Sequence, residues 1–174
     1  MSEYKNQLGR VVAKLPPLRE VNHQIPLVDE GKQYTYHLPC CLDSLKPQLA
    51  EKIQLYMSAK WWIMASVLQA APMLCIPKKM GKLRTVIDCR KRNDNTVKDV
   101  TPFSDQDQIR MDIMRVRYCL KIDLSNAYEQ VRVEPEDFKK TAFSTIFGTF
   151  LSQVMQQGDC NAPATFQQLM MVVL

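Results

Sequence analysis

Residues 73–88 read M-L-C-I-P-K-K-M-G-K-L-R-T-V-I-D, two β-prone runs on either side of Met80-Gly81. This pattern predicts a β-hairpin, because glycine adopts the backbone conformations that a tight turn requires. Pro77 has no N–H group to offer a neighbouring strand, so the first run lies at a sheet edge or ends at this residue. The hairpin would carry several cationic side chains at its tip or just behind it: Lys78, Lys79, Lys82 and Arg84.

The segments around the hairpin mix helical and strand patterns without strict alternation, which favours an α+β fold. Helices are expected over 43–58, 105–116 and 161–174, and strands over 118–124, 141–146 and 150–155. We divide the chain into an extended N-terminal arm over 1–40, a region with the β-hairpin over 41–104, and a third region over 105–174.

Positive charge is concentrated in one segment. Eight basic and two acidic residues lie between Lys78 and Lys98, so this stretch accounts for the whole net charge of +5. A local excess of this kind suits a polyanion such as nucleic acid or a nucleoside triphosphate. An ordinary solvated face has the same composition, so charge alone leaves both readings open.

The six cysteines favour a reducing compartment. They include no C-x-x-C pair, and the chain has only two histidines, which argues against a zinc site. We expect free, mostly buried thiols. No apolar run approaches the roughly 18 residues of a membrane helix, and the start has no apolar signal core. A soluble intracellular protein without a membrane partner is therefore expected.

Asp123 interrupts the strand expected over 118–124, within the stretch K-I-D-L-S-N-A-Y-E-Q-V-R-V. Alternation puts Leu120, Ile122 and Leu124 on one face and Asp123 on the other. Aspartate is disfavoured in strands, so a partner has to stabilise it. Two partners fit: a nearby Lys or Arg, or a Mg²⁺ ion, which prefers hard carboxylate oxygens on a rigid element.

Four segments carry a family resemblance: L-P-P-L-R-E-V-N-H-Q-I-P-L, A-P-M-L-C-I-P-K-K-M-G-K-L-R-T-V-I-D-C-R-K-R-N, K-I-D-L-S-N-A-Y-E-Q-V-R-V with K-T-A-F-S-T, and N-A-P-A-T-F-Q-Q-L-M. In this order, and from about Leu15 to Leu174, they resemble reverse transcriptases of gypsy-class long-terminal-repeat retrotransposons. The resemblance implies reverse-transcriptase fingers over 41–104 and a partial palm over 105–174, with return strands to the fingers. The palm would be an incomplete ferredoxin-like split βαβ motif.

The resemblance implies an RNA-directed DNA polymerase, which transfers nucleotides from deoxynucleoside triphosphates to a primer on an RNA or DNA template. Asp123 would bind two Mg²⁺ ions, with the backbone oxygen of Leu124 on the second. The implied nucleotide-binding residues are Lys78 or Lys79, Arg84, the backbone N–H groups of Asn126 and Ala127, Tyr128 as a steric gate against a 2′-hydroxyl, and Gln157. The implied nucleic-acid contacts are Lys82, Arg90 and Arg92, and Asp88 is expected to pair with Arg90.

Of three departures from the family pattern, two bear directly on activity. Asp159 puts a negative charge beside the phosphate pocket, and we expect it to weaken nucleotide binding. The family's Tyr-x-Asp-Asp hairpin lies beyond Leu174, and no Asp-Asp pair occurs in this sequence. We therefore expect this chain alone to be inactive or nearly so. The alternative is a non-catalytic remnant that binds nucleic acid or a partner protein through the basic hairpin.

The resemblance also bears on location and assembly. It implies the cytoplasmic particle of a retroelement, and the run Arg90-Lys91-Arg92 leaves a nuclear-import patch open as an alternative to template contact. Sheet edges and apolar faces of an incomplete palm favour self-association.

Overall fold

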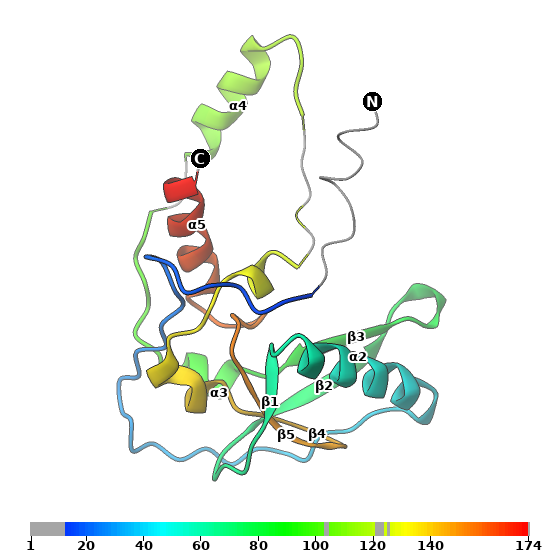
Figure 1. The fold of residues 1–174 in the computed structure, drawn as a ribbon. Helices are drawn as coiled ribbons and strands as arrows, with labels where there is room; N and C mark the ends of the chain where they lie inside the picture. Colours follow the sequence, from blue (N-terminus) through cyan, green and yellow to red (C-terminus); the bar gives the residue numbers. More distant parts are fainter. Residues whose placement is uncertain (1–12, 103–104, 121–123, 125, 174) are drawn as a thin grey trace.

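A mixed five-stranded sheet lies at the centre of the structure, a computed structural model that describes residues 13–102, 105–120, 124 and 126–173 (Figure 1). The strands are β1 (Trp62–Met64), β2 (Ala71–Pro77), β3 (Leu83–Ile87), β4 (Phe143–Thr145) and β5 (Gly148–Ser152). Their order is β1-β5-β4-β2-β3, with β2 and β4 parallel and the other neighbours antiparallel.

Helices accompany the sheet without alternating with its strands, which confirms the predicted α+β class. The α-helices are α2 (Lys46–Ser58), α3 (Arg90–Asn93), α4 (Gln106–Arg115) and α5 (Ala162–Val173). Short 3₁₀ turns lie between them: η1 (Asp43–Leu45), η2 (Lys79–Gly81), η3 (Tyr128–Gln130) and η4 (Pro135–Thr141).

The β2–β3 pair is the hairpin that the sequence predicts. Its ladder places Ile76 opposite Arg84. The chain reverses in η2, where Gly81 has a φ of 71°, a conformation that residues with a Cβ rarely adopt. The N–H of Lys78 donates to the carbonyl of Lys82 at 2.7 Å and closes the turn. The tip is therefore a defined structure that fixes the directions of its lysines.

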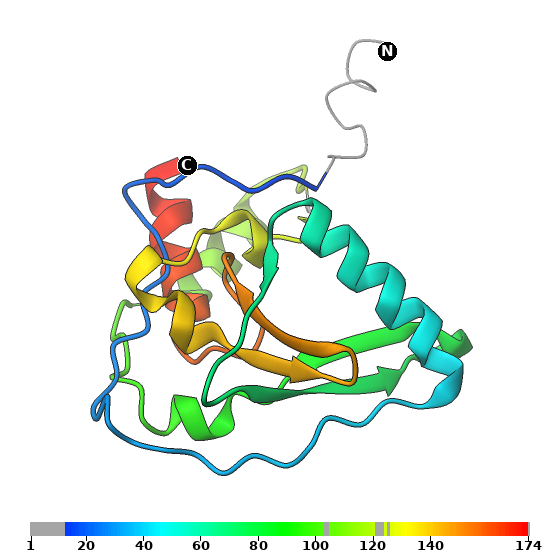
Figure 2. The same cartoon turned by 60° about the horizontal axis from the view of Figure 1, so that its bottom comes forward.

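Helix α2 lies across one face of the sheet (Figure 2). Leu49 and Ile53 bury their side chains there, because they are four residues apart and so share one face of the helix. Beneath them, the ring of Trp62 packs edge-on against Phe143, with ring centroids 4.8 Å apart. This core anchors α2 and the sheet as one body.

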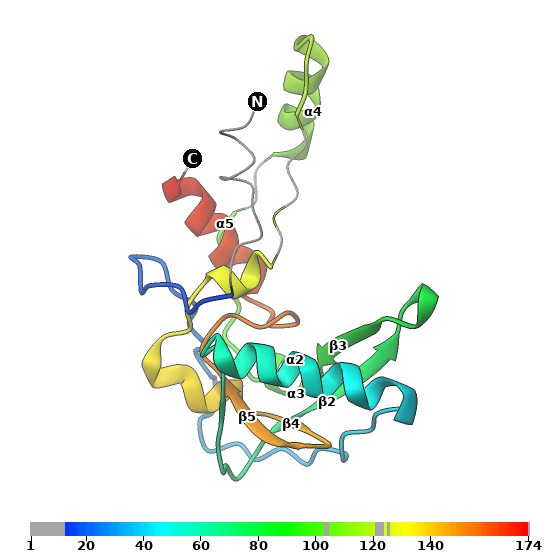
Figure 3. The same cartoon turned by 45° about the vertical axis from the view of Figure 1, so that its right-hand side comes forward.

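The strand expected over 118–124 is absent from its described part. Residues 118–120 form no strand, and Tyr118 and Leu120 are each 83% exposed. A strand persists only when another strand accepts its hydrogen bonds, and no described segment pairs with residues 118–120. Helix α4 matches the predicted 105–116, yet it buries no residue and projects away from the sheet (Figures 1 and 3).

Residues 13–40 contain no helix and no extended strand. Hydrogen bonds along this segment hold it to the rest of the chain, such as the one from the N–H of His23 to the carbonyl of Arg132 at 2.7 Å. His23 and Ile25 are buried there. Among the described residues, no helix is long and apolar enough to cross a membrane.

All six cysteines carry free thiols, in agreement with the sequence, but the expected burial is wrong. Only Cys89 is buried, whereas Cys40 and Cys119 are exposed. Cys119 follows α4 into the exposed segment, where no element of the described residues covers it.

Candidate nucleotide pocket

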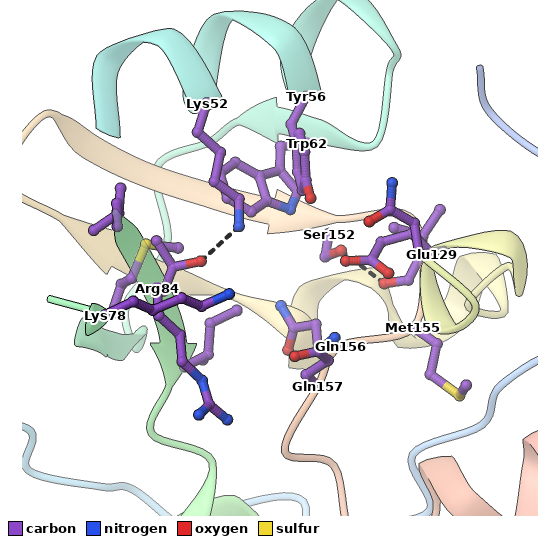
Figure 4. Close-up of a pocket in the computed structure, with 16 residues that line it drawn as sticks. Lys52, Tyr56, Trp62, Lys78, Arg84, Glu129, Ser152, Met155, Gln156 and Gln157 are labelled. Atoms are coloured by element: carbon purple, nitrogen blue, oxygen red, sulfur yellow. Dashed lines mark hydrogen bonds between the residues drawn. The ribbon is translucent and has the colours of Figure 1, made fainter. Parts of the chain in front are cut away.

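A cavity of about 260 Å³ lies between α2, the β2–β3 hairpin and the turn after β5 (Figure 4). Four of the predicted nucleotide-binding residues line it: Lys78, Arg84, Asn126 and Gln157. They come from three segments that are distant in the sequence. The fold therefore brings together four of the seven residues that the resemblance assigned to the nucleotide.

The cationic side of the cavity is built by the hairpin. Lys78 directly follows β2 and Arg84 lies on β3, so the turn between them places both charges at one end of the ribbon. Neither side chain forms an ion pair within the described residues. Two unpaired cations beside a cavity can bind an anionic group such as a phosphate.

The opposite side is set by the turn that follows β5. Gly158 has a φ of 110°, and a Cβ added there would lie 3.3 Å from the carbonyl oxygen of Ile87. The amide of Asn93 donates to the Gly158 carbonyl at 2.7 Å. Glycine thus lets this turn pass close to the end of β3, which puts the preceding Gln157 beside the cavity.

We expect Gly158→Ala to lower the free energy of unfolding by about 1–3 kcal/mol, because the new Cβ meets both a strained φ and a backbone oxygen. Urea denaturation measures this change. Gly31→Ala is the control, since its φ is ordinary and its Cβ would lie 3.4 Å from the nearest atom, the Asp29 carboxylate. Equal destabilisation by both substitutions would contradict the role of Gly158.

Two residues that the sequence analysis missed also line the cavity, Lys52 on α2 and Glu129 in η3. Lys52 donates to Oγ1 of Thr85 at 2.6 Å. Burial lowers the pKa of Lys52, while the charge of Glu129 acts in the opposite direction. Lys52 lies between the buried Leu49 and Ile53 on α2. A cation beside the apolar face of this helix was the sequence signal that could have pointed to Lys52.

The other predicted residues lie outside the cavity lining. Tyr128 packs its ring edge-on against Phe166 at 5.7 Å, within a small core that includes Val131 and Met155. Its role as a steric gate therefore stays a prediction without support from this geometry. Lys79 is exposed at the hairpin tip, Ala127 directly precedes η3, and Leu124 is 51% exposed.

Asp159 is buried in an ion-pair cluster and does not line the nucleotide cavity. Arg92 pairs with one of its carboxylate oxygens, and Nε2 of His23 lies 3.2 Å from the other. Burial alone would raise the pKa of Asp159, but the charges and hydrogen bonds of Arg92 and His23 hold it below its usual value. The expected repulsion of nucleotide by Asp159 is therefore not supported, because its charge is compensated.

Arg92 also differs from its predicted role. Arg92 is 4% exposed. Its guanidinium donates to the Lys140 carbonyl at 2.6 Å and to Oε1 of Gln156 at 3.0 Å. A side chain used in this way has no surface left for a nucleic acid, so the predicted contact is not supported.

Arg90 is exposed and pairs with Asp88 at 2.7 Å, as expected. Hydrogen bonding from Arg90 lowers the pKa of Asp88 to about 2. Lys82 is exposed near the hairpin tip. Nucleic-acid contacts by Lys82 and Arg90 stay predictions that this geometry permits.

Asp123 lies outside the described residues, so the structure says nothing of its side chain. Within the described part of the chain, no group of three or more His, Cys, Asp or Glu residues is arranged to hold a metal ion. We therefore derive no catalytic step through a metal.

Solved structures share this fold. The foamy viral protease-reverse transcriptase in a selenomethionine-labelled mutant form has a TM-score of 0.75 at 20% identity, over 99% of this chain and 23% of that one. A foamy viral protease-reverse transcriptase in complex with dsDNA has a TM-score of 0.72 at 21% identity, over 90% of this chain and 31% of that one. At these identities the likeness shows the fold, that of reverse-transcriptase fingers and palm.

The chain belongs to the reverse transcriptase (RNA-dependent DNA polymerase) family, whose sequence profile matches residues 76–174. A retrovirus-related Pol polyprotein from transposon 297 of Drosophila melanogaster is 38% identical over 60% of this chain and 10% of the relative. The transposon Tf2-3 polyprotein of Schizosaccharomyces pombe is 30% identical over 92% of this chain and 12% of the relative. The chain thus spans about a tenth of these curated relatives, and the resemblance to retrotransposon polymerases is confirmed.

Proposed function

We propose that this chain is the fingers and front palm of an RNA-directed DNA polymerase. The full polymerase would transfer deoxynucleotides from their triphosphates to a primer on an RNA or DNA template. The observation that carries the proposal is the cavity in which Lys78, Arg84, Asn126 and Gln157 meet. Membership of the reverse transcriptase family supports the same reaction.

The cavity is suited to orient a triphosphate. Arg84 offers a planar fork of N–H donors that matches phosphate oxygens, and Lys78 offers a point charge. The amide side chains of Asn126 and Gln157 carry no charge and can bond sugar hydroxyl groups. Phosphates would therefore lie toward the hairpin and the sugar toward the turn after β5.

Reverse transcriptases generally use a divalent metal ion, and we propose Mg²⁺ with Asp123 and the Leu124 carbonyl among its ligands. Two divalent ions about 4 Å apart repel strongly, by about 16 kcal/mol at an effective dielectric of about 20, an upper bound rather than a net energy. Several carboxylates are needed to offset such repulsion. Since this sequence has no Asp-Asp pair, we propose that the chain alone does not extend a primer.

Template-primer binding tests the proposal against a protein-interaction role. We expect the chain to bind an RNA/DNA hybrid with an affinity that falls steeply as salt rises, because phosphate contacts release counterions. Fluorescence anisotropy across a salt series measures the slope. Lys82→Met should reduce the slope by about one if Lys82 contacts one phosphate.

The control is Lys32→Met, an exposed lysine of the N-terminal arm far from the hairpin in the sequence. It should leave the slope unchanged. Absence of hybrid binding, or binding that ignores salt, would contradict the proposal and favour a partner-protein surface.

A further inference from the structure

The nucleotide cavity is lined by a third cation that the hairpin does not supply. Lys52 reaches it from α2, on the same side as Lys78 and Arg84 (Figure 4). Within the described residues, none of these three cations forms an ion pair. Three positive charges around one cavity, against the one carboxylate of Glu129 among its described lining residues, favour an anion with several charges.

The position of the Lys52 ammonium is fixed by its surroundings. It lies 4.9 Å from the ring centroid of Tyr56 and 5.8 Å from that of Trp62, so both rings attract the cation. It donates to Thr85 at 2.6 Å. An ammonium carries three donors, and Thr85 is the one acceptor recorded for it among the described residues. Donor capacity therefore remains for a ligand.

The packing of helix α2 against the sheet fixes the backbone position of Lys52. Leu49 and Ile53, on either side of Lys52, are buried in the core against the sheet. Lys78, in contrast, adjoins the exposed η2 turn. A phosphate held from both places would be clamped between a rigid helix and the hairpin.

We propose that Lys52 is a third phosphate contact of this pocket, supplied by α2 in addition to Lys78 and Arg84. The inference rests on the proposed nucleotide-binding function and adds a residue to it. Burial disfavours the charged form of Lys52, and the negative charge of a bound polyphosphate would stabilise that charged form.

Glu129 provides a second test of the proposal, because removing its charge should change the affinity in the opposite direction. It is the one carboxylate among the described residues that line the cavity. Its Oε2 atom is buried without a hydrogen-bond partner. A negative charge in this place attracts Lys52 and repels an entering anion. Removing the charge of Glu129 should therefore strengthen anion binding, and removing that of Lys52 should weaken it.

Isothermal titration of this chain with inorganic tripolyphosphate, without divalent metal, tests the proposal. Lys52→Met keeps most of the aliphatic stem over the rings and removes the charge; we expect roughly tenfold weaker binding. Glu129→Gln should bind about threefold more tightly. Lys52→Arg, which keeps the charge, should retain most of the affinity, and circular dichroism checks that each variant folds.

Lys46→Met is the matched control, since it removes one charge from the same helix at a residue that does not line the cavity. Equal weakening by Lys46→Met and Lys52→Met would overturn the proposal, because the effect would then be long-range. Weakening by Arg84→Met but not by Lys52→Met would also overturn it and leave the proposed function standing. If the unsubstituted chain binds no tripolyphosphate, the assignment of this cavity to phosphate is wrong for Lys78 and Arg84 as well as for Lys52, while hybrid binding still tests the proposed function separately.

Discussion

Replacing Arg92 with methionine is expected to lower the free energy of unfolding by about 3–5 kcal/mol. The substitution leaves the buried carboxylate of Asp159 without its main counter-charge, and an uncompensated buried charge is costly. It also removes the guanidinium N–H groups that donate to Oε1 of Gln156 and to the Lys140 carbonyl. Urea denaturation followed by circular dichroism measures the loss.

Arg90→Met is the control, because Arg90 is an exposed neighbour with its own ion pair to Asp88. Its loss should destabilise the fold less than the loss of Arg92, since the Arg90 side chain is 83% exposed and solvent screens its charge. Combining Arg92→Met with Asp159→Asn should destabilise less than the sum of the two single substitutions, by about 1–3 kcal/mol. Additive effects would contradict the coupling of these two residues.

The same cluster predicts how stability depends on pH. The pKa of Asp159 is lowered in the folded chain, so its contribution is complete above the unfolded pKa of about 3.9. The contribution is lost as pH falls through the lower, folded pKa. Asp159→Asn should therefore make the free energy of unfolding depend less steeply on pH below about pH 4, because the titration of Asp159 no longer contributes.

Arg84→Met is expected to weaken binding of a deoxynucleoside triphosphate by roughly 10- to 100-fold. Arg84 is the guanidinium among the cavity-lining residues, and a hydrogen bond between charged groups contributes about 1.5–3 kcal/mol. Isothermal titration of the variant and the unsubstituted chain gives the ratio. Arg84→Lys should recover part of the affinity, because it keeps the charge but not the fork.

The hairpin lysines supply the discriminating controls. Lys78 lines the cavity and Lys79 does not, although the two are adjacent. Lys78→Met should weaken triphosphate binding, whereas Lys79→Met should not. If Lys79→Met has the same effect as Arg84→Met, net charge rather than the cavity geometry determines binding, and the assignment is wrong.

Local sequence patterns were sufficient to predict the elements that depend mainly on neighbouring residues. The β2–β3 hairpin follows from two β-prone runs and Gly81, and α2 follows from apolar residues at helical spacing. The phosphate role of Arg84 and of Lys78 or Lys79 came from the family resemblance, because the charge pattern alone fits a solvated face equally well. The choice between Lys78 and Lys79 could not be made, because it depends on how the η2 turn directs consecutive side chains.

Long-range pairing was the main source of error. His23, Arg92 and Asp159 come from three distant segments, and nothing local indicates that they share one buried cluster. Asp159 therefore looked like a charge in the nucleotide pocket and Arg92 like a surface cation. Lys52 was missed for the same reason, since only the packing of α2 on the sheet brings it to the cavity. The segment 118–120 lacks a paired strand among the described residues, so its β-prone pattern has no ladder to join.

The pairing of β2 with β4 has a consequence for biosynthesis. Ala71 pairs with Phe143, so the strand that completes this edge leaves the ribosome roughly seventy residues later, or about 4–14 seconds at usual translation rates. During that interval β1 and β2 present open backbone edges, and the ring of Trp62 lacks its later aromatic neighbours Phe143 and Phe150. The nascent chain thus passes through a period in which molecular chaperones have an apolar surface to hold.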